Sequence, residues 1–198
     1  MAKRLFDLIA AGLGLALLAL PGLLVALAIK LDSPGPVFFR QERVGRGGRP
    51  FRIHKFRSMR VEAERQGQLT VGADARITRV GGWLRRSKLD ELPQLIDVLV
   101  GDMSLVGPRP EVPRYVAVYP ASLRDVVLSV RPGITDPASL RLADESLLLA
   151  HAVDPEKEYV EVILPAKLEE AAAYAKQATL MSDLRIIFRT LSLLLKRI

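Results

Sequence analysis

The stretch LIAAGLGLALLALPGLLVALAI, residues 8–29, decides the fold, because it has no charge in a chain that is 26% charged. A straight helix over this stretch would rise ~33 Å, enough to cross a hydrocarbon core of ~30 Å. Pro21 lies inside it, and an internal proline removes a backbone hydrogen bond and kinks a helix. The two arms, ~20 Å and ~10 Å long, are each too short to cross.

Positive charges flank this apolar stretch on both sides. Lys3 and Arg4 precede it, and Lys30 follows it, with further arginines in the next segment. Because positive residues favour the cytoplasmic side, we expect both ends of the helix there. We therefore predict a re-entrant membrane helix over residues 1–30, with a kinked spanning helix as the alternative. Arg4 and Asp7, three residues apart, are expected to pair.

Composition narrows the class of protein. The 198 residues are enough for one domain with a core; 49% are hydrophobic, the mean hydropathy is +0.20 and the net charge is +7. A chain both basic and apolar favours an anionic membrane surface over nucleic acid, and no nucleic-acid-binding motif is present. The absence of cysteine excludes disulfides, and the wide separation of His54 and His151 argues against a histidine metal site or a Ser-His triad.

The remaining sequence predicts a mainly α fold with a small β-hairpin. Residues 37–41 and 51–55 are rich in β-forming residues and flank a glycine-rich turn. Residues 76–86 and the C-terminal helix have amphipathic patterns, which suit a membrane surface or a core. An apolar stripe after Pro93 predicts another helix. Further helices are expected over 111–119, 122–129, 155–163 and 165–177.

Two neighbouring segments carry the candidate chemistry: Leu89-Asp90-Glu91-Leu92-Pro93-Gln94 and Gly101-Asp102-Met103-Ser104-Leu105-Val106-Gly107-Pro108-Arg109-Pro110. Asp90 and Glu91 are expected near a positive helix N-terminus, where nearby cations favour ionised carboxylates. Arg109 stands between two prolines, which restrict its backbone, so its guanidinium suits bidentate binding of a phosphate. Carboxylates beside a phosphate receptor suggest phosphoryl chemistry; the alternative is helix-end charge and an ordinary turn. The cations near the dyad are Arg85, Arg86 and Lys88.

Several segments, in order along residues 3–135, resemble motifs of the bacterial monotopic phosphoglycosyl transferases. The stretch from Lys88 to Pro110 is the core of the resemblance. The other matching segments are Lys3-Arg4 with Asp7, Val37-Phe38-Phe39-Arg40-Gln41-Glu42-Arg43-Val44-Gly45, Lys55-Phe56-Arg57-Ser58-Met59 and Arg131-Pro132-Gly133-Ile134-Thr135.

This resemblance implies an enzyme that moves a phosphosugar from a UDP-sugar to undecaprenyl (polyprenyl) phosphate. Asp90 would be the nucleophile that forms a covalent aspartyl-phosphosugar, with release of UMP, and Glu91 would be its partner. Mg²⁺ would be required, with Asp90 as a ligand, and Arg109 and Arg85 would contact phosphates. The product would start surface glycan assembly.

The resemblance also implies a location and an organisation. Residues 31–198 would form a cytoplasmic catalytic domain with membrane-surface helices, making the chain a monotopic protein of the bacterial inner membrane. Its partners would be the two substrates and anionic lipids of the inner leaflet, without nucleic acid. Apolar helices left exposed are compatible with a homodimer.

Two departures from the family pattern leave questions open. Leu20-Pro21 replaces the usual Ser-Pro pair, which leaves the sharpness of the bend undetermined. Asp136-Pro137-Ala138-Ser139 replaces a Gly-x-Ala-Gln run, which leaves the sugar undetermined. Two other classes stay open: a non-enzymatic basic scaffold at the membrane surface, and a basic nucleic-acid binder that would bind without lipid.

Overall fold

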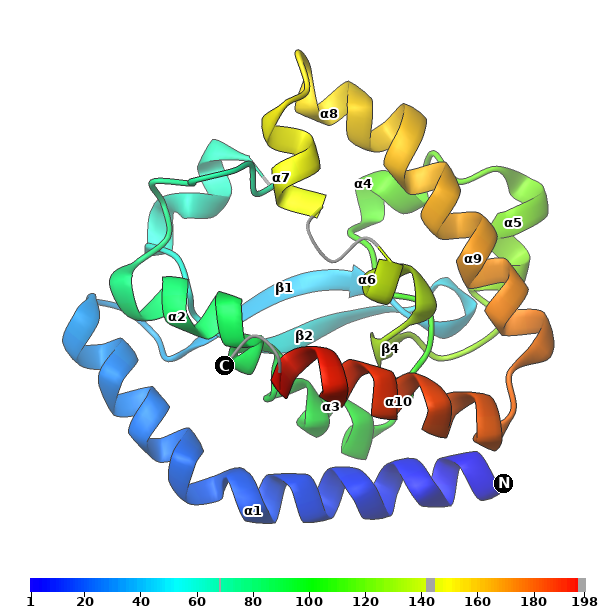
Figure 1. Ribbon diagram of the computed structural model, residues 1–198, viewed down its shortest axis with the longest axis horizontal. Helices are drawn as coiled ribbons and strands as arrows, with labels where there is room; N and C mark the ends of the chain where they lie inside the picture. Colours follow the sequence, from blue (N-terminus) through cyan, green and yellow to red (C-terminus); the bar gives the residue numbers. More distant parts are fainter. Residues whose placement is uncertain (68, 142–144, 196–198) are drawn as a thin grey trace.

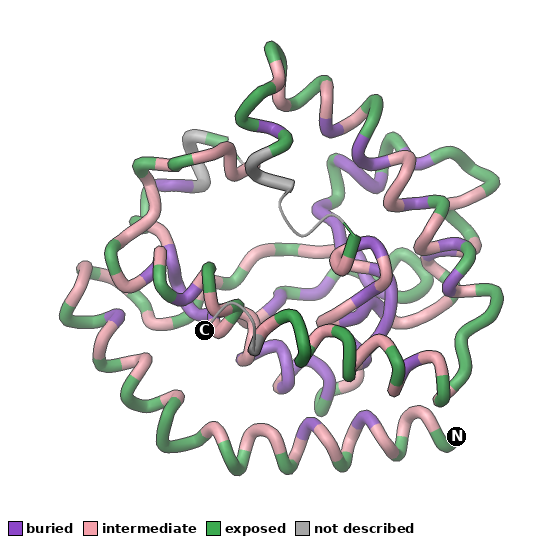
Figure 2. The backbone as a smooth tube through the Cα atoms, in the orientation of Figure 1, coloured by how far each residue is buried: buried purple, intermediate pink, exposed green. Residues whose placement is uncertain are grey.

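The computed structural model describes residues 1–67, 69–141 and 145–195, and these are mostly helical (Figure 1). Two small two-stranded sheets lie among the helices. The long helix α1 (Ala2–Asp32) runs along one side of the molecule. The buried residues concentrate in the centre, around the strands and the helices that pack on them (Figure 2).

Helix α1 continues through Pro21 and bends partway along its length (Figure 1). Its apolar side chains are largely exposed; Leu17, for example, is 79% exposed and Leu31 80%. Within the described residues, α1 is the one helix whose length and apolar composition suffice to cross a membrane. On its inner side, Ala11 packs with Leu95 and Val98 of α3 (Gln94–Val100).

Both ends of α1 are bonded to the rest of the protein. At its start Lys3 Nζ donates to the Val106 carbonyl over 3.0 Å, and at its end Asp32 Oδ2 accepts from the Val80 amide over 3.1 Å. The predicted pairing of Arg4 with Asp7 is wrong. Arg4 Nη1 instead donates to the Val98 carbonyl at 2.8 Å, because Val98 lies in the last turn of α3, where carbonyls are left outside the regular helical hydrogen bonds.

Asp7 is buried and serves as an internal acceptor. It accepts from Ser104 Oγ at 2.8 Å and from the Leu105 amide at 3.2 Å. These bonds fix α1 to strand β3 (Ser104–Val106), which lies just before the Arg109 segment.

The predicted β-hairpin is present and longer than expected. Strands β1 (Phe38–Val44) and β2 (Pro50–Phe56) are antiparallel, with Phe38 opposite Phe56 and their rings stacked at 5.6 Å. The turn between them includes Gly47 at φ 67°, a conformation that favours glycine.

A second sheet was not predicted. Strand β3 pairs in parallel with β4 (Gly133–Thr135). The two strands approach at Gly107 and Gly133, where a Cβ on Gly133 would lie 2.0 Å from the Gly107 nitrogen. Glycine therefore allows the parallel pair to close, and the Gly133 amide donates to the Pro108 carbonyl at 3.0 Å, which connects the pair to the Pro108–Pro110 segment.

Helix α2 (Arg79–Ser87) is shorter than the predicted helix over 76–86 at its start, because Thr78 caps it by accepting from the Gly81 amide at 3.0 Å. Its apolar face is directed to the core: Leu84 is fully buried with Ile29 and Phe56. Trp83 is 48% exposed on another side. The amphipathic pattern thus reflects a core-facing helix with one aromatic residue left at the surface.

The C-terminal half is a set of helices around a second core. The predicted helix over 111–119 is reduced to one turn, and the predicted helices over 155–163 and 165–177 are joined by a π-helical turn, Tyr159–Ile163. Helices α6 and α7 were not predicted. The helices of this half are α4 (Pro113–Val116), α5 (Ala121–Val127), α6 (Pro137–Arg141), α7 (Glu145–Ala150), α8 (Pro155–Glu158), α9 (Leu164–Gln177) and α10 (Leu180–Leu195). A short 3₁₀ helix, η2 (Val61–Gln66), lies earlier, between β2 and α2.

Candidate active site

Asp90 and Glu91 lie in a single 3₁₀ turn, Leu89–Glu91, between α2 and α3. The sequence placed them at the start of the following helix, but that helix begins only at Gln94, after Pro93. Lys88 ends α2 at φ 58°, and it is the one residue other than glycine with positive φ in the described part of the chain. This break redirects the backbone, so both carboxylates line one cavity.

The cavity has a volume of about 770 Å³, within the range of small-molecule sites. It lies between the hairpin, the dyad turn and the C-terminal helices. All four predicted site residues line it, so the structure brings Asp90, Glu91, Arg85 and Arg109 together. Other cations on its wall include Arg40, Arg43, Lys55, Lys88 and Lys167.

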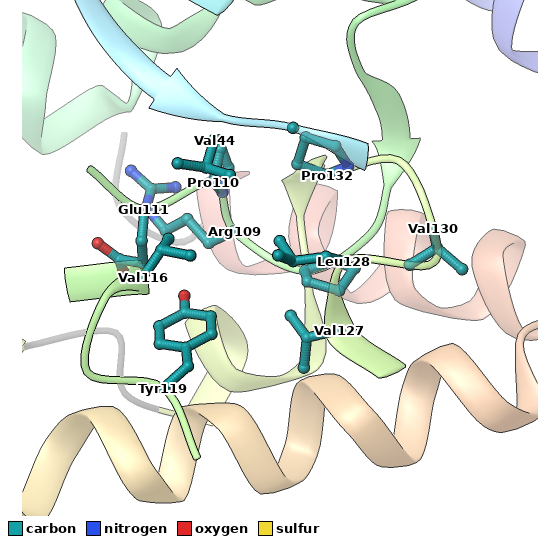
Figure 3. Close-up of a pocket in the computed structure, with 12 residues that line it drawn as sticks. Val44, Arg109, Pro110, Glu111, Val116, Tyr119, Val127, Leu128, Val130 and Pro132 are labelled. Carbon is teal, nitrogen blue, oxygen red and sulfur yellow. The ribbon is translucent and has the colours of Figure 1, made fainter. Parts of the chain in front are cut away.

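The Arg109 segment is held from the side by apolar packing. Figure 3 shows Arg109, Pro110 and Glu111 beside the side chains of Val116, Tyr119 and Val127, which line a small adjacent pocket. Pro108 and Pro110 restrict the backbone on both sides of the arginine. The guanidinium is therefore held in place before any substrate arrives.

Glu91 is clamped by two cations. Both terminal nitrogens of Arg109 donate to its carboxylate, and Lys55 Nζ donates to Oε1 at 2.9 Å. Burial alone would raise the pKa of Glu91, but the charges of Arg109 and Lys55 outweigh it and hold that pKa well below its usual range. Glu91 therefore stays ionised and fixes the two cations.

Asp90, unlike Glu91, is buried without a cation bonded to it in the part of the chain that the structure describes. It is 7% exposed, and its Oδ1 has no hydrogen-bond partner among the described residues. Burial raises the pKa of Asp90, and the negative charge of Glu91 adds to the effect, while Lys55, Arg85 and Lys88 oppose it. A buried carboxylate oxygen without a partner has its lone pairs available to attack an electrophile or bind a cation.

Arg85 is more weakly engaged than Arg109. Its Nη2 donates to Thr70 Oγ1 at 2.9 Å, and it borders the same cavity as Asp90. A bond to a neutral hydroxyl can be exchanged for an anion at lower cost than an ion pair. Arg85 is thus the more available cation, and Arg109 the more rigid one.

Sequence reasoning missed Lys55 as a site residue, although it belongs to a matched motif. Burial lowers the pKa of the Lys55 ammonium, and the charge of Glu91 partly restores it. The sequence did place Lys55 on the second strand of the hairpin, where the structure has it opposite Phe39. Nothing in the sequence showed that this hairpin face turns toward the dyad.

The donor set fits a hard cation that takes most of its ligands from substrate. Within the described residues, no group of three or more histidine, cysteine or acidic side chains could enclose a metal. Mg²⁺ commonly uses one or two carboxylates together with substrate phosphates and water. The unpartnered Oδ1 of Asp90 on the cavity wall is such a ligand.

Comparison with known proteins now adds a family to this geometry. The profile of bacterial sugar transferases matches residues 1–197. The chain belongs to this family. The predicted resemblance is therefore confirmed, and the match extends beyond the motifs into the C-terminal helices.

Relatives with assigned activities cover nearly all of the chain. It is 39% identical over 196 residues to the UDP-N-acetylgalactosamine-undecaprenyl-phosphate N-acetylgalactosaminephosphotransferase of Aeromonas hydrophila. This alignment covers 98% of the chain and 43% of that relative. It is 42% identical over 197 residues to the UDP-glucose:undecaprenyl-phosphate glucose-1-phosphate transferase of Caulobacter vibrioides, covering 98% and 69%. The chain thus spans less than half of the Aeromonas protein, and the two relatives differ in the sugar their names give.

Proposed function

We propose that this sugar transferase moves a sugar 1-phosphate from a UDP-sugar to undecaprenyl phosphate, through a covalent intermediate on Asp90, as the first membrane step of surface glycan assembly. The observation that carries the proposal is the contrast within the dyad: Glu91 is clamped by Arg109 and Lys55, whereas Asp90 Oδ1 has no partner within the described structure. One carboxylate holds cations for a diphosphate, and the other is available to react.

In the first step, an Asp90 carboxylate oxygen attacks the phosphorus that bears the sugar. The new bond joins this oxygen to phosphorus, and the bond from phosphorus to the bridging oxygen breaks, so UMP leaves with that oxygen. In the second step, a phosphate oxygen of undecaprenyl phosphate attacks the same phosphorus and the aspartyl bond breaks. The products are an undecaprenyl diphosphosugar and a regenerated Asp90.

The chain's cations stabilise the charge that develops on the phosphate oxygens. Arg109 presents a planar fork and Lys55 a point charge, both held by Glu91. Arg85 is available for the leaving phosphate. Mg²⁺, held by Asp90 and substrate oxygens, would supply further neutralisation of phosphate charge.

Membrane placement is part of the proposal. Lys3 at one end of α1 and Asp32 at the other both bond to the same globular body. A helix crossing the bilayer would separate its ends, so these bonds support a helix that enters one leaflet and returns. The exposed leucines then meet lipid, and the dyad lies near the level of the acceptor's phosphate, at the cytoplasmic face of the inner membrane.

The test uses detergent-solubilised protein with polyprenyl phosphate, Mg²⁺ and a panel of UDP-sugars. We expect UMP release with at least one sugar, and loss of at least about 10³-fold in Asp90→Asn. With the acceptor omitted, mass spectrometry should place a phosphosugar adduct on Asp90. Asp102→Asn, which changes an exposed acid two residues past the end of α3 and outside the cavity wall, is the matched control and should keep activity.

Two results would contradict the proposal. An adduct on another residue would reject Asp90 as the nucleophile. Absence of UMP release with every sugar would instead favour a non-enzymatic scaffold that uses the same exposed helix and basic surface.

A further inference from the structure

A second polar cluster lines the same cavity as the dyad, and the mechanism above does not use it. It consists of Arg43 from β1, Glu111 from the segment before α4, Tyr159 from the π-helical turn and Lys167 from α9; we call it the Glu111 network. These residues are far apart in the sequence and meet only in the fold.

The Glu111 network is tightly bonded and well buried. Tyr159 donates its hydroxyl to Glu111 Oε1 at 2.7 Å, and Lys167 Nζ donates to the same oxygen at 3.3 Å and to the Tyr159 hydroxyl at 3.2 Å. Arg43 Nη1 lies 3.8 Å from Glu111 Oε2. Glu111 is 8% exposed and Tyr159 2% exposed.

Stability alone does not account for this arrangement. Buried ion pairs contribute little net stability compared with apolar side chains of the same volume. The π-helical turn Tyr159–Ile163 interrupts an otherwise regular helix, and such turns are rare and frequent at functional sites. Arg43 Nε also lies buried without a hydrogen-bond partner among the described residues, although Arg43 borders the cavity. A ligand oxygen would satisfy it.

The chemistry of the network suits hydroxyl groups rather than phosphate. Lys167 and Arg43 hold the pKa of Glu111 below its usual range against the opposing effect of burial, so the carboxylate is ionised and offers an acceptor that an ionised phosphate oxygen, which has no proton to donate, cannot use. A hydroxyl group can donate to a carboxylate and accept from an ammonium or guanidinium at once. The phosphates already have Arg109, Lys55 and Arg85 on the dyad side.

We propose that the Glu111 network binds hydroxyl groups of the sugar being transferred and so contributes to the choice of UDP-sugar. This inference rests on the proposed function. The ribose of the nucleotide presents the same kind of hydroxyl groups, so the experiment separates the two by using UMP, which carries the ribose and lacks the sugar.

The experiment measures transfer of labelled sugar to polyprenyl phosphate by wild type, Lys167→Met, Lys167→Arg and Tyr159→Phe. We expect KM for the UDP-sugar to rise about tenfold in Lys167→Met, the loss of one to two hydrogen bonds to a charged group, with partial rescue in Lys167→Arg. The kcat should change little, because Asp90 is intact. Inhibition by added UMP should be unchanged in every variant.

Lys176→Met is the matched control, because it makes the same substitution at an exposed position of α9 outside the cavity wall. Its KM should equal that of wild type. If Lys167→Met does not fold, the KM of Tyr159→Phe for the UDP-sugar tests the inference instead. This substitution removes one hydroxyl and keeps the ring contact with Tyr115.

Unchanged KM in folded variants would overturn the inference and leave the proposed function standing. Weaker inhibition by UMP, in step with the KM, would also overturn it, by assigning the network to the nucleotide. If wild type transferred no sugar from any UDP-sugar, the proposed function would fail, and this inference would fail with it.

Discussion

Asp90 and Glu91 are neighbours in the chain and differ in their electrostatics. Glu91 lies between Arg109 and Lys55, and these cations hold its pKa well below the usual range against the effect of burial. Asp90 is buried without such a clamp, and burial together with the charge of Glu91 raises its pKa. Environment therefore separates the roles of two similar side chains, as in other paired acids.

This difference predicts the pH dependence of transfer. Attack requires ionised Asp90, so kcat/KM should fall as pH drops through a pKa that is higher than that of an ordinary aspartate, by about tenfold per pH unit below it. Lys88→Asn removes a positive charge that favours ionised Asp90, and asparagine tolerates the positive φ at this position. The acid limb of the pH–rate profile should therefore move to higher pH.

Lys88→Arg, which keeps the charge, is the control and should leave the acid limb in place. A limb that does not move in Lys88→Asn would show that another group governs the pH–rate profile.

The raised pKa of Asp90 also affects the stability of the protein. At pH values above this pKa the ionised Asp90 destabilises the fold, so Asp90→Asn should unfold at a higher temperature than wild type there; the gain should shrink as pH falls through the raised pKa and vanish below the ordinary pKa of an aspartate.

At the level of elements, the start of α1 is fastened by a small polar cluster. Asp183 of α10 is 1% exposed and pairs with Lys3, while the Tyr174 hydroxyl of α9 donates to Asp183 Oδ1 at 2.6 Å and to the Val106 carbonyl at 3.1 Å. Four elements thus meet beside the end of β3. Because β3 leads into the Arg109 segment, the position of the anchor helix is linked to that of the cavity wall.

Asp183→Ala should destabilise the protein by about 3 kcal/mol, because it removes the carboxylate that pairs with Lys3 and accepts from the buried Tyr174 hydroxyl, and leaves both to share the Val106 carbonyl. Lys3→Met should also destabilise the protein, by about 2 kcal/mol, because it leaves the buried carboxylate of Asp183 without its cation, although Lys3 itself is 36% exposed at its side chain. The measurement is denaturant unfolding in detergent.

Glu169→Ala, at an exposed position of α9, is the control and should change stability by about 0.5 kcal/mol or less. Equal small effects for Asp183→Ala and Glu169→Ala would show that the cluster does not fasten α1.

At the level of the whole molecule, many of the exposed large apolar side chains lie on α1, and others lie on further helices. Trp83 of α2, Val100 of α3 and Phe188 of α10 are 48%, 66% and 67% exposed. An apolar surface this extensive requires a lipid or protein cover in water. With both ends of α1 bonded to the body, the arrangement supports a protein that rests on one face of a membrane.

Topology can be tested cleanly because the chain has no cysteine. Single substitutions Ala2→Cys and Ser122→Cys place one thiol at the start of α1 and one on the exposed side of α5. A membrane-impermeant maleimide should label both in inside-out inner-membrane vesicles and neither in intact spheroplasts. Leu17→Cys, on the exposed side of α1, should be protected in both preparations.

Labelling of Ala2→Cys from the opposite side to Ser122→Cys would establish a spanning helix and contradict the re-entrant proposal. Labelling of Leu17→Cys in vesicles would show that this side of α1 meets water or a protein instead of lipid.

Much of the local structure followed from the sequence. The uncharged stretch predicted α1, the glycine-rich turn predicted the hairpin, and the two segments around Asp90 and Arg109 predicted a shared site. These features depend on neighbours in the chain, through periodicity, turn residues and proline geometry. The family resemblance rested on the same local motifs, which is why it was confirmed.

Only the tertiary structure determined which strands pair and which side chains bond to one another. The parallel pairing of β3 with β4, the clamp of Lys55 and Arg109 on Glu91, and the bonds from Lys3 and Arg4 to distant carbonyls join residues separated by tens of positions. Arg4 illustrates the reason: Asp7 was its nearest candidate in sequence, but buried groups take the partners that packing brings to them. Sequence therefore determined the anchor helix, the hairpin and the residues available for chemistry, and long-range packing determined the surroundings of each carboxylate and so the direction in which its pKa shifts.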